Sequence, residues 1–95
     1  MSVGFEWNAN KATLNLSKHR VSFDEATTVF DDPLAAVFDD LDHSAKERRE
    51  IIVGHSVRGT LLLVCFSEQA NIIRIFSARP VTKRERKDYE ENIHK

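Results

Sequence analysis

The sequence predicts a small α+β domain in which a meander of strands is preceded by a helix pair and followed by a C-terminal helix. Two stretches of the form Ser/Thr-x-x-Glu, at residues 22–25 and 82–85, are typical of helix starts, because each side chain can satisfy backbone N–H groups of the first turn. Between them, residues 34–78 contain apolar runs separated by short polar turns, which favours an antiparallel meander. The 95 residues suffice for one domain, 1–95, with one core.

The N-terminal third predicts an edge strand and two helices. Phe5-Glu6-Trp7 alternates as a short edge strand, and residues 8–18 follow as a helix that begins at an asparagine N-cap. The expected packed face of that helix is Ala12, Leu16 and His19. After Ser22, a second helix carries its apolar face on Phe23, Ala26, Thr27 and Phe30. Asp31-Asp32-Pro33 ends it, because the residue before a proline is disfavoured in the α region.

Four further strands are expected at residues 34–38, 49–56, 60–67 and 72–78. The third is apolar from Leu61 to Phe66, which is typical of a central strand buried on both faces. Residues 39–47 are acidic and indicate a loop, and Thr82 begins a C-terminal helix. The predicted order is therefore β-α-α-β-β-β-β-α, an antiparallel meander with an N-terminal helix pair and a C-terminal helix. We expect the helices to cover one face of the sheet.

Composition excludes several classes of protein. No apolar run approaches the ~20 residues of a membrane span, and residues 1–7 lack the basic and apolar regions of a secretory signal. With one cysteine, Cys65, in an apolar strand, we expect a cytoplasmic protein without a disulfide. The histidines lack zinc spacing, the acidic loop lacks the pattern of an EF-hand, and there is no glycine-rich phosphate loop. We therefore expect no metal and no cofactor.

The net charge of −1 hides an asymmetry between the two halves of the chain. Residues 1–47 carry four Lys/Arg against nine Asp/Glu, whereas residues 48–95 carry ten against six. A basic C-terminal half is compatible with an anionic partner such as RNA. An ordinary solvated surface explains the same charges equally well.

Arg79 lies where the last strand meets the C-terminal helix, and strand alternation places it on the face of Ile73 and Ile75. Cleavage of RNA without a metal needs a base for the ribose 2′-OH, an acid for the leaving oxygen and a cation for the phosphorane. Arg79 is the candidate cation. His55 or Glu68 could act as the base, and a histidine or Tyr89 as the acid. The candidates for binding the RNA backbone are Arg49, Arg58, Lys83 and Arg84.

Each candidate also has an ordinary structural explanation. His55 is a common kind of strand residue, and Tyr89 could simply pack against the sheet. Glu85 has a first role as the capping partner of Thr82.

Several motifs, spread in order over almost the whole chain, resemble the BrnT toxin family. In the N-terminal part and the middle they are Phe5-Glu6-Trp7-x-x-x-Lys11, Asn15-Leu16-x-Lys18-His19, Val21-Ser22-Phe23-Asp24-Glu25-Ala26, Val29-Phe30-Asp31-Asp32-Pro33 and Arg48-x-x-Ile51-Ile52-x-Gly54. The family's ending is resembled by Ile73-Arg74-Ile75-x-Ser77-Ala78-Arg79 and Glu85-x-x-x-Tyr89-Glu90.

The resemblance implies a small bacterial toxin of a type II toxin–antitoxin pair, with a RelE-like ribonuclease fold. It implies that the protein cleaves RNA and thereby inhibits translation and growth. The implied partner is a BrnA-like antitoxin, encoded alongside, which binds the toxin tightly in a hetero-oligomer. Operator DNA would be contacted only through the antitoxin.

Two departures from the family's usual pattern stand out. Arg20 follows Lys18-His19 where the family usually has glycine, and Arg in a left-handed position costs roughly 1 kcal/mol. Pro80 follows Arg79 and stiffens the joint, because proline fixes φ and removes a donor. Two other interpretations stay open: a binding module without catalysis, and a degenerate family member that keeps only its antitoxin-binding surface.

Overall fold

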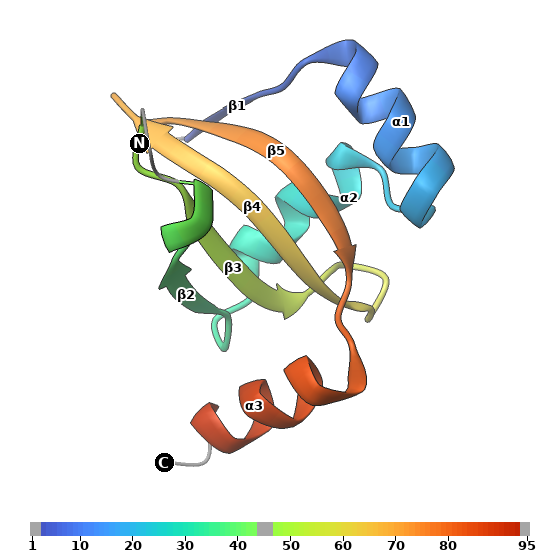
Figure 1. Cartoon of the computed structure of the whole chain (residues 1–95), viewed down its shortest axis with the longest axis vertical. Coiled ribbons are helices and arrows are strands. Elements are labelled where there is room, and N and C mark those ends of the chain that lie inside the picture. Colours follow the sequence, from blue (N-terminus) through green and yellow to red (C-terminus); the bar gives the residue numbers. More distant parts are fainter. Residues whose placement is uncertain (1–2, 44–46, 94–95) are drawn as a thin grey trace.

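The computed structural model describes residues 3–43 and 47–93. Over these residues the chain forms a five-stranded sheet of order β1-β5-β4-β3-β2 with helices packed on it (Figure 1). The strands are β1 (Gly4–Glu6), β2 (Ala36–Asp39), β3 (Glu50–His55), β4 (Leu61–Gln69) and β5 (Ile72–Pro80). The helices are α1 (Ala9–His19), α2 (Phe23–Thr28) and α3 (Lys83–Ile93), with 3-10 turns η1 (Val29–Asp31) and η2 (Leu41–His43). Residues 44–46 of the predicted acidic loop lie outside the described residues.

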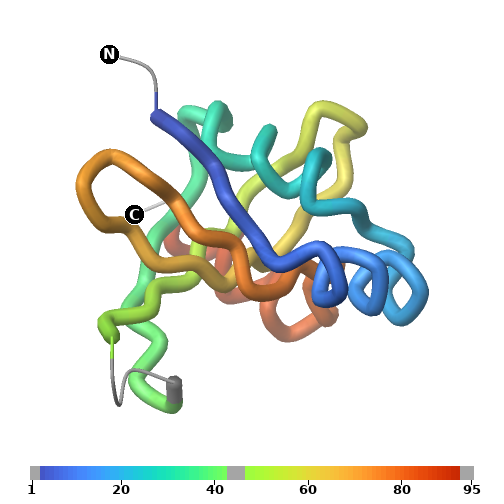
Figure 2. The backbone as a smooth tube through the Cα atoms, turned by 90° about the horizontal axis from the view of Figure 1, so that it is seen from above, coloured from blue at the N-terminus to red at the C-terminus, as the bar shows by residue number. Residues whose placement is uncertain are grey.

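The antiparallel meander of the last four strands is confirmed, and β1 is an edge strand as expected. The sheet as a whole is mixed, however, because β1 pairs with β5 in parallel, Gly4 opposite Ile72. Figure 2 shows β1, in blue, running beside β5, in orange. A parallel pair needs a long connection, and here the rest of the fold supplies it.

An extra residue in β5 changes the direction of the side chains that follow it. Cys65 pairs with Ser77 but Phe66 pairs with Ile75, so Phe76 is an unpaired bulge residue. The alternation expected from the sequence is therefore wrong beyond this point. Ile73 and Ile75 face the core under α1 and α2, whereas Arg79 lies opposite Leu63 on the other face.

The helices cover both faces of the sheet, so the expectation of one covered face is wrong. Phe23 and Ala26 of α2 pack on one face, in a core with Leu62 and Val64 of β4. On the opposite face, Tyr89 of α3 packs against Val53 and Leu61. Because β4 is apolar on both sides, each side needs its own cover, and α3 provides the second one. None of the helices described is long and apolar enough to cross a membrane.

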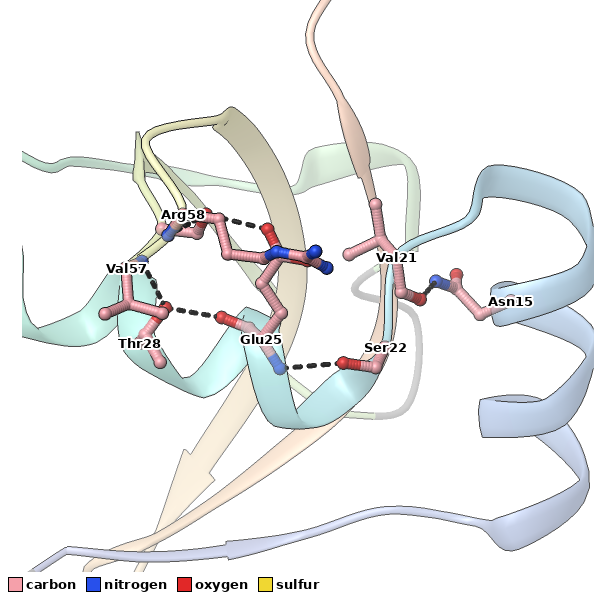
Figure 3. Close-up of polar contacts among 8 residues, drawn as sticks. Asn15, Val21, Ser22, Glu25, Thr28, Val57 and Arg58 are labelled. Atoms are coloured by element: carbon pink, nitrogen blue, oxygen red, sulfur yellow. Dashed lines mark hydrogen bonds and ion pairs between the residues drawn. The ribbon is translucent and has the colours of Figure 1, made fainter.

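Helix α1 is attached to the sheet by a buried amide. Asn15 donates from Nδ2 to the carbonyl oxygens of Val21 (2.9 Å) and Ala78 (2.8 Å), and its Oδ1 accepts from Ala78 N–H (3.1 Å). Figure 3 shows Asn15 of α1 directed at Val21 in the segment that leads to α2. The side chain thus replaces a neighbouring strand at β5 beyond the end of β1. The expected apolar face is corrected accordingly: Asn15 is buried and Leu16 is 51% exposed.

The first helix ends at Arg20 in the left-handed conformation, in spite of the cost of a side chain with a Cβ at this position. Its φ of 58° and ψ of 29° are those of a C-cap, and its N–H donates to the Leu16 carbonyl at 2.9 Å. A side chain with a Cβ is strained there, and glycine is not.

We expect Arg20→Gly to stabilise the protein by about 0.5–1 kcal/mol, because it removes the Cβ strain at the helix end. The measurement is the free energy of unfolding in urea. Lys18→Gly, two residues earlier within α1, is the matched control and should cost about 1 kcal/mol. A loss of stability in Arg20→Gly would show that the Arg20 side chain makes a stabilising interaction in solution.

Candidate active site on the α3 face of the sheet

Arg79 is held by a bidentate ion pair at the joint between β5 and α3. Its Nη1 and Nη2 donate to Glu85 Oε1 and Oε2, both at 2.8 Å. Glu85 also completes the predicted capping box, since Oε1 accepts from Thr82 N–H (2.9 Å) and Thr82 Oγ1 accepts from Glu85 N–H (3.1 Å). The hydrogen bonds from Arg79, opposed by partial burial, lower the pKa of Glu85 to about 2. The guanidinium is therefore fixed in direction and one-third exposed.

His55 lies at the end of β3 beside Asp32, a carboxylate that the sequence indicates only as part of a helix stop. Asp32 Oδ2 accepts from the His55 backbone N–H at 2.7 Å and lies 3.6 Å from its Nδ1. Burial acts to raise the pKa of Asp32, but hydrogen bonds from the N–H groups of His55 and Leu34 outweigh it, so the pKa is lowered. Asp32 therefore stays ionised at neutral pH next to an imidazole that is 45% exposed.

Gly54 allows the Asp32 loop to lie this close to β3. A Cβ at Gly54 would stand 2.9 Å from Ala35 Cβ and 3.1 Å from Asp32 Oδ2. These distances are too short for any larger residue without displacement of the loop. The glycine thus sets the approach of Asp32 to His55.

Tyr89 is buried on the same face, and its phenol has a partner. The hydroxyl donates to the Leu34 carbonyl at 3.1 Å, and the ring meets His55 edge-on with centroids 6.0 Å apart. Burial, with a smaller contribution from the Asp32 charge, raises the pKa of Tyr89. Tyr89 therefore packs against the sheet, which is the ordinary structural explanation given for it above, and its ring lies next to His55.

Helix α3 joins the two pairs. Glu85 and Tyr89 are four residues apart and therefore lie on one side of the helix. Glu85 holds Arg79, and Tyr89 contacts His55. A cation and a histidine–carboxylate pair consequently share the α3 face of the sheet, linked by one helical turn.

Glu68 is not part of this group. It pairs with Ile73 near the far end of β4, whereas Arg79 pairs with Leu63, and alternation puts Glu68 on the opposite face from Arg79. The structure therefore separates two of the predicted catalytic residues.

The predicted RNA-binding residues fall in three places. Lys83 and Arg84 are exposed in the first turn of α3, next to Glu85. Arg58 lies in the turn after β3, its Nη1 3.9 Å from Glu25 Oε1 (Figure 3). Arg49 stacks its guanidinium 3.9 Å from the centre of the Phe76 ring.

Glu25 fixes the turn that carries Arg58. Its N–H donates to Ser22 Oγ at 3.0 Å, the hydrogen bond of the predicted N-cap (Figure 3). Its carboxylate, however, accepts from Ser56 Oγ at 2.7 Å. Thr28 Oγ1 accepts from Val57 N–H at 2.9 Å. The turn is thereby anchored to α2.

Within residues 3–43 and 47–93, no group of three or more His, Cys, Asp or Glu is arranged to hold a metal ion. The side chains of His43 and His94 lie outside what the structure describes. Partial burial raises the pKa of the Cys65 thiol, which suits a packing role.

A groove of about 430 Å³ lies between α3 and the sheet. Its floor is apolar and its α3 wall is acidic and includes Glu85 and Tyr89. The groove therefore adjoins both pairs of the candidate site. Its lining residues are Phe38, Ile51, Val53, Leu63, Glu85, Asp88, Tyr89, Glu91 and Asn92.

Fold and site define a small α+β protein with a fixed cation and a histidine–carboxylate pair on one face of a mixed sheet. A family model described as "Ribonuclease toxin, BrnT, of type II toxin-antitoxin system" matches residues 7–85. The match spans most of the chain, and the chain belongs to the BrnT toxin family.

The fold is also that of a solved family member. The crystal structure of the Brucella abortus ribonuclease toxin, BrnT, aligns with a TM-score of 0.66 at 19% sequence identity, covering 86% of this chain and 100% of that one. At this identity the likeness establishes the fold. A comparison with curated proteins finds no match.

We expect Glu85→Gln to lower the free energy of unfolding by about 1–2 kcal/mol at pH 7, allowing for solvent screening of a partly exposed pair. Because the folded-state pKa lies below the ordinary value of 4.5, the stabilisation is present above about pH 4.5 and lost as the pH falls toward 2. Urea unfolding of both proteins across this range should show the difference shrinking with acidity.

Glu90→Gln alters an exposed carboxylate on the same helix and should change stability by less than about 0.5 kcal/mol. A Glu85→Gln effect that is equally large at pH 7 and pH 2.5 would contradict the ion-pair explanation.

Proposed function

We propose that this protein is a toxin that cleaves RNA, inhibits translation and growth, and is neutralised by a BrnA-like antitoxin. The observation that carries the proposal is the joint placement of Arg79 and the His55–Asp32 pair on one sheet face, in a chain of the BrnT family. These groups supply a cation for phosphate and an oriented proton acceptor.

In the proposed reaction His55 takes the proton of a ribose 2′-OH, and the 2′-oxygen attacks the adjacent phosphorus. Asp32 stabilises the imidazolium that forms, because it is ionised and faces Nδ1. Arg79 stabilises the charge of the phosphorane. The bond from phosphorus to the 5′-oxygen then breaks, that oxygen is protonated, and a 2′,3′-cyclic phosphate and a 5′-hydroxyl result.

The geometry narrows the set of proton-transfer candidates. The Tyr89 hydroxyl donates to the Leu34 carbonyl and the side chain is buried, so we do not assign proton transfer to it. We assign it the role of positioning His55, which its ring contacts. Glu68 lies at the far end of β4 and is left out of the proposed reaction. The imidazolium of His55, formed in the first step, can return its proton to the leaving oxygen. No metal enters this proposal.

The remaining basic residues would bind the RNA backbone. Lys83 and Arg84 extend from the Arg79 end of the site, and Arg58 lies beyond the His55 end, three residues along the chain. Arg49 presents a guanidinium stacked on Phe76. Phosphates along a single strand could therefore contact the first turn of α3 and the β3–β4 turn.

The finer features implied by family membership remain predictions. They are a RelE-like relationship of the fold, a BrnA-like identity of the antitoxin, contact with operator DNA only through that antitoxin, a hetero-oligomeric complex and a cytoplasmic site of action.

We expect Arg79→Ala to lower the rate of RNA cleavage about 10²–10³-fold and His55→Ala about 10²–10⁴-fold, because each removes a group that acts on the transition state. Cleavage of a labelled single-stranded RNA, with analysis of the product ends, provides the measurement. Cyclic phosphate ends are expected, and both variants should also lose growth inhibition.

Glu85→Gln is the matched control for Arg79→Ala, since it loses the same ion pair but keeps the guanidinium. An equal loss of activity in the two variants would reduce Arg79 to a structural role. RNA left intact by the unchanged protein, with and without ribosomes, would instead support a binding module and overturn the proposal.

A further inference from the structure

The groove beside α3 opens toward the edge of the sheet formed by β2. Its floor is Phe38 of β2 with Ile51 and Val53 of β3, and across it stand Asp88 and Glu91 of α3. A groove with an apolar floor and one acidic wall suits a segment that presents apolar side chains on one side and basic ones on the other.

Strand β2 carries unusual apolar exposure for an edge strand. Val37 is 52% and Phe38 is 42% exposed, and Leu34 and Leu41 at its two ends are 59% and 84% exposed. Among residues 3–43 and 47–93, no strand pairs with its outer edge. Such an edge offers backbone hydrogen bonds to an added strand, and it is a liability unless a partner covers it.

The acidic residues of the groove wall are electrostatically unfavourable for the stability of α3. Asp88, Glu90 and Glu91 lie near the C-terminal end of α3, where the helix dipole is already negative, and the last turn holds no basic residue. Cations from a partner would relieve this unfavourable field. The same field repels RNA, whose phosphates would meet carboxylates here.

We propose that β2 and this groove dock an extended segment of the antitoxin. The segment adds a strand to β2, inserts apolar side chains over Phe38 and Ile51, and places lysine or arginine against Asp88 and Glu91. This inference rests on the proposed function, in which an antitoxin binds and neutralises the protein, and the antitoxin is therefore the partner we assign to the groove. The acidity of the groove and the open strand edge define what that partner presents.

Occupation of the groove would also neutralise the site. Glu85 and Tyr89 line the groove and, at the same time, hold Arg79 and contact His55. A segment in the groove therefore contacts Glu85 and Tyr89, the two residues that position Arg79 and His55, and would act on the site through them.

The test measures binding of two probes by calorimetry: the purified antitoxin encoded beside this chain, and a synthetic peptide that alternates valine with lysine. The double variant Asp88→Lys/Glu91→Lys should weaken both at least about tenfold. Phe38→Lys should do the same. Hydrogen exchange of the complex should show new protection at residues 36–39.

Matched controls come from the same molecule. Glu90→Lys reverses one charge on α3, half the change of the double variant, at a residue outside the groove lining, and Leu14→Lys alters an exposed apolar residue of α1. Both should bind the probes within about twofold of the unchanged chain. A peptide that alternates valine with glutamate should not bind.

Equal binding by the Asp88/Glu91 and Glu90 variants, or no binding by the unchanged chain, would overturn the docking proposal. The readout is independent of catalysis. If the chain binds as expected but cleaves no RNA, the proposed function fails and the docking site stands. If the chain cleaves RNA but the groove variants bind the probes normally, the docking proposal fails and the proposed function stands.

Discussion

The extra residue in β5 is the constraint on which the arrangement of the site depends. Without Phe76 as a bulge, regular alternation would direct Arg79 into the apolar core beneath α1 and α2, where a guanidinium would be desolvated at high cost. With the bulge, Ala78 is buried against the amide of Asn15, and Arg79 faces Glu85. One inserted residue thus places an apolar residue and a cation on their correct sides.

Helix α3 has two halves of opposite charge. Its first turns are basic and contain the carboxylate that holds Arg79, whereas its last turns are acidic and form one wall of the groove. The boundary falls at Tyr89, which is buried against the sheet and anchors the helix. The proposed RNA-binding surface and the proposed docking groove therefore meet at a single helix and use charges of opposite sign.

Local signals predicted the elements of this fold well, because capping and burial act over a few residues. The Thr82–Glu85 box and the buried β4 strand both follow from such signals. What depends on distant parts of the chain was not visible. The bulge cannot be recognised from the alternation of residues in β5, so the sheet face predicted for Arg79 was wrong. No local feature of the sequence showed which face of the sheet α3 would cover.

The candidate site was predictable to the same degree. The sequence predicts Arg79 and His55 as candidates because they stand at strand ends, whereas it indicates Asp32 only as part of a helix stop. Its role depends on an approach between residues far apart in sequence, which Gly54 permits. Glu68 was included for its residue type, and only the register of β4 against β5 separates it from Arg79.

The pairing of β1 with β5 has a consequence for the order in which the protein can assemble. Gly4 meets Ile72, so the first strand cannot dock until nearly the whole sheet has been synthesised, and closing so long a loop is entropically slow. Arg79 and α3 follow later still. A nascent chain therefore makes the edge strand β2 early, and it completes the ion pair of Arg79 with Glu85 only when its last residues have been added.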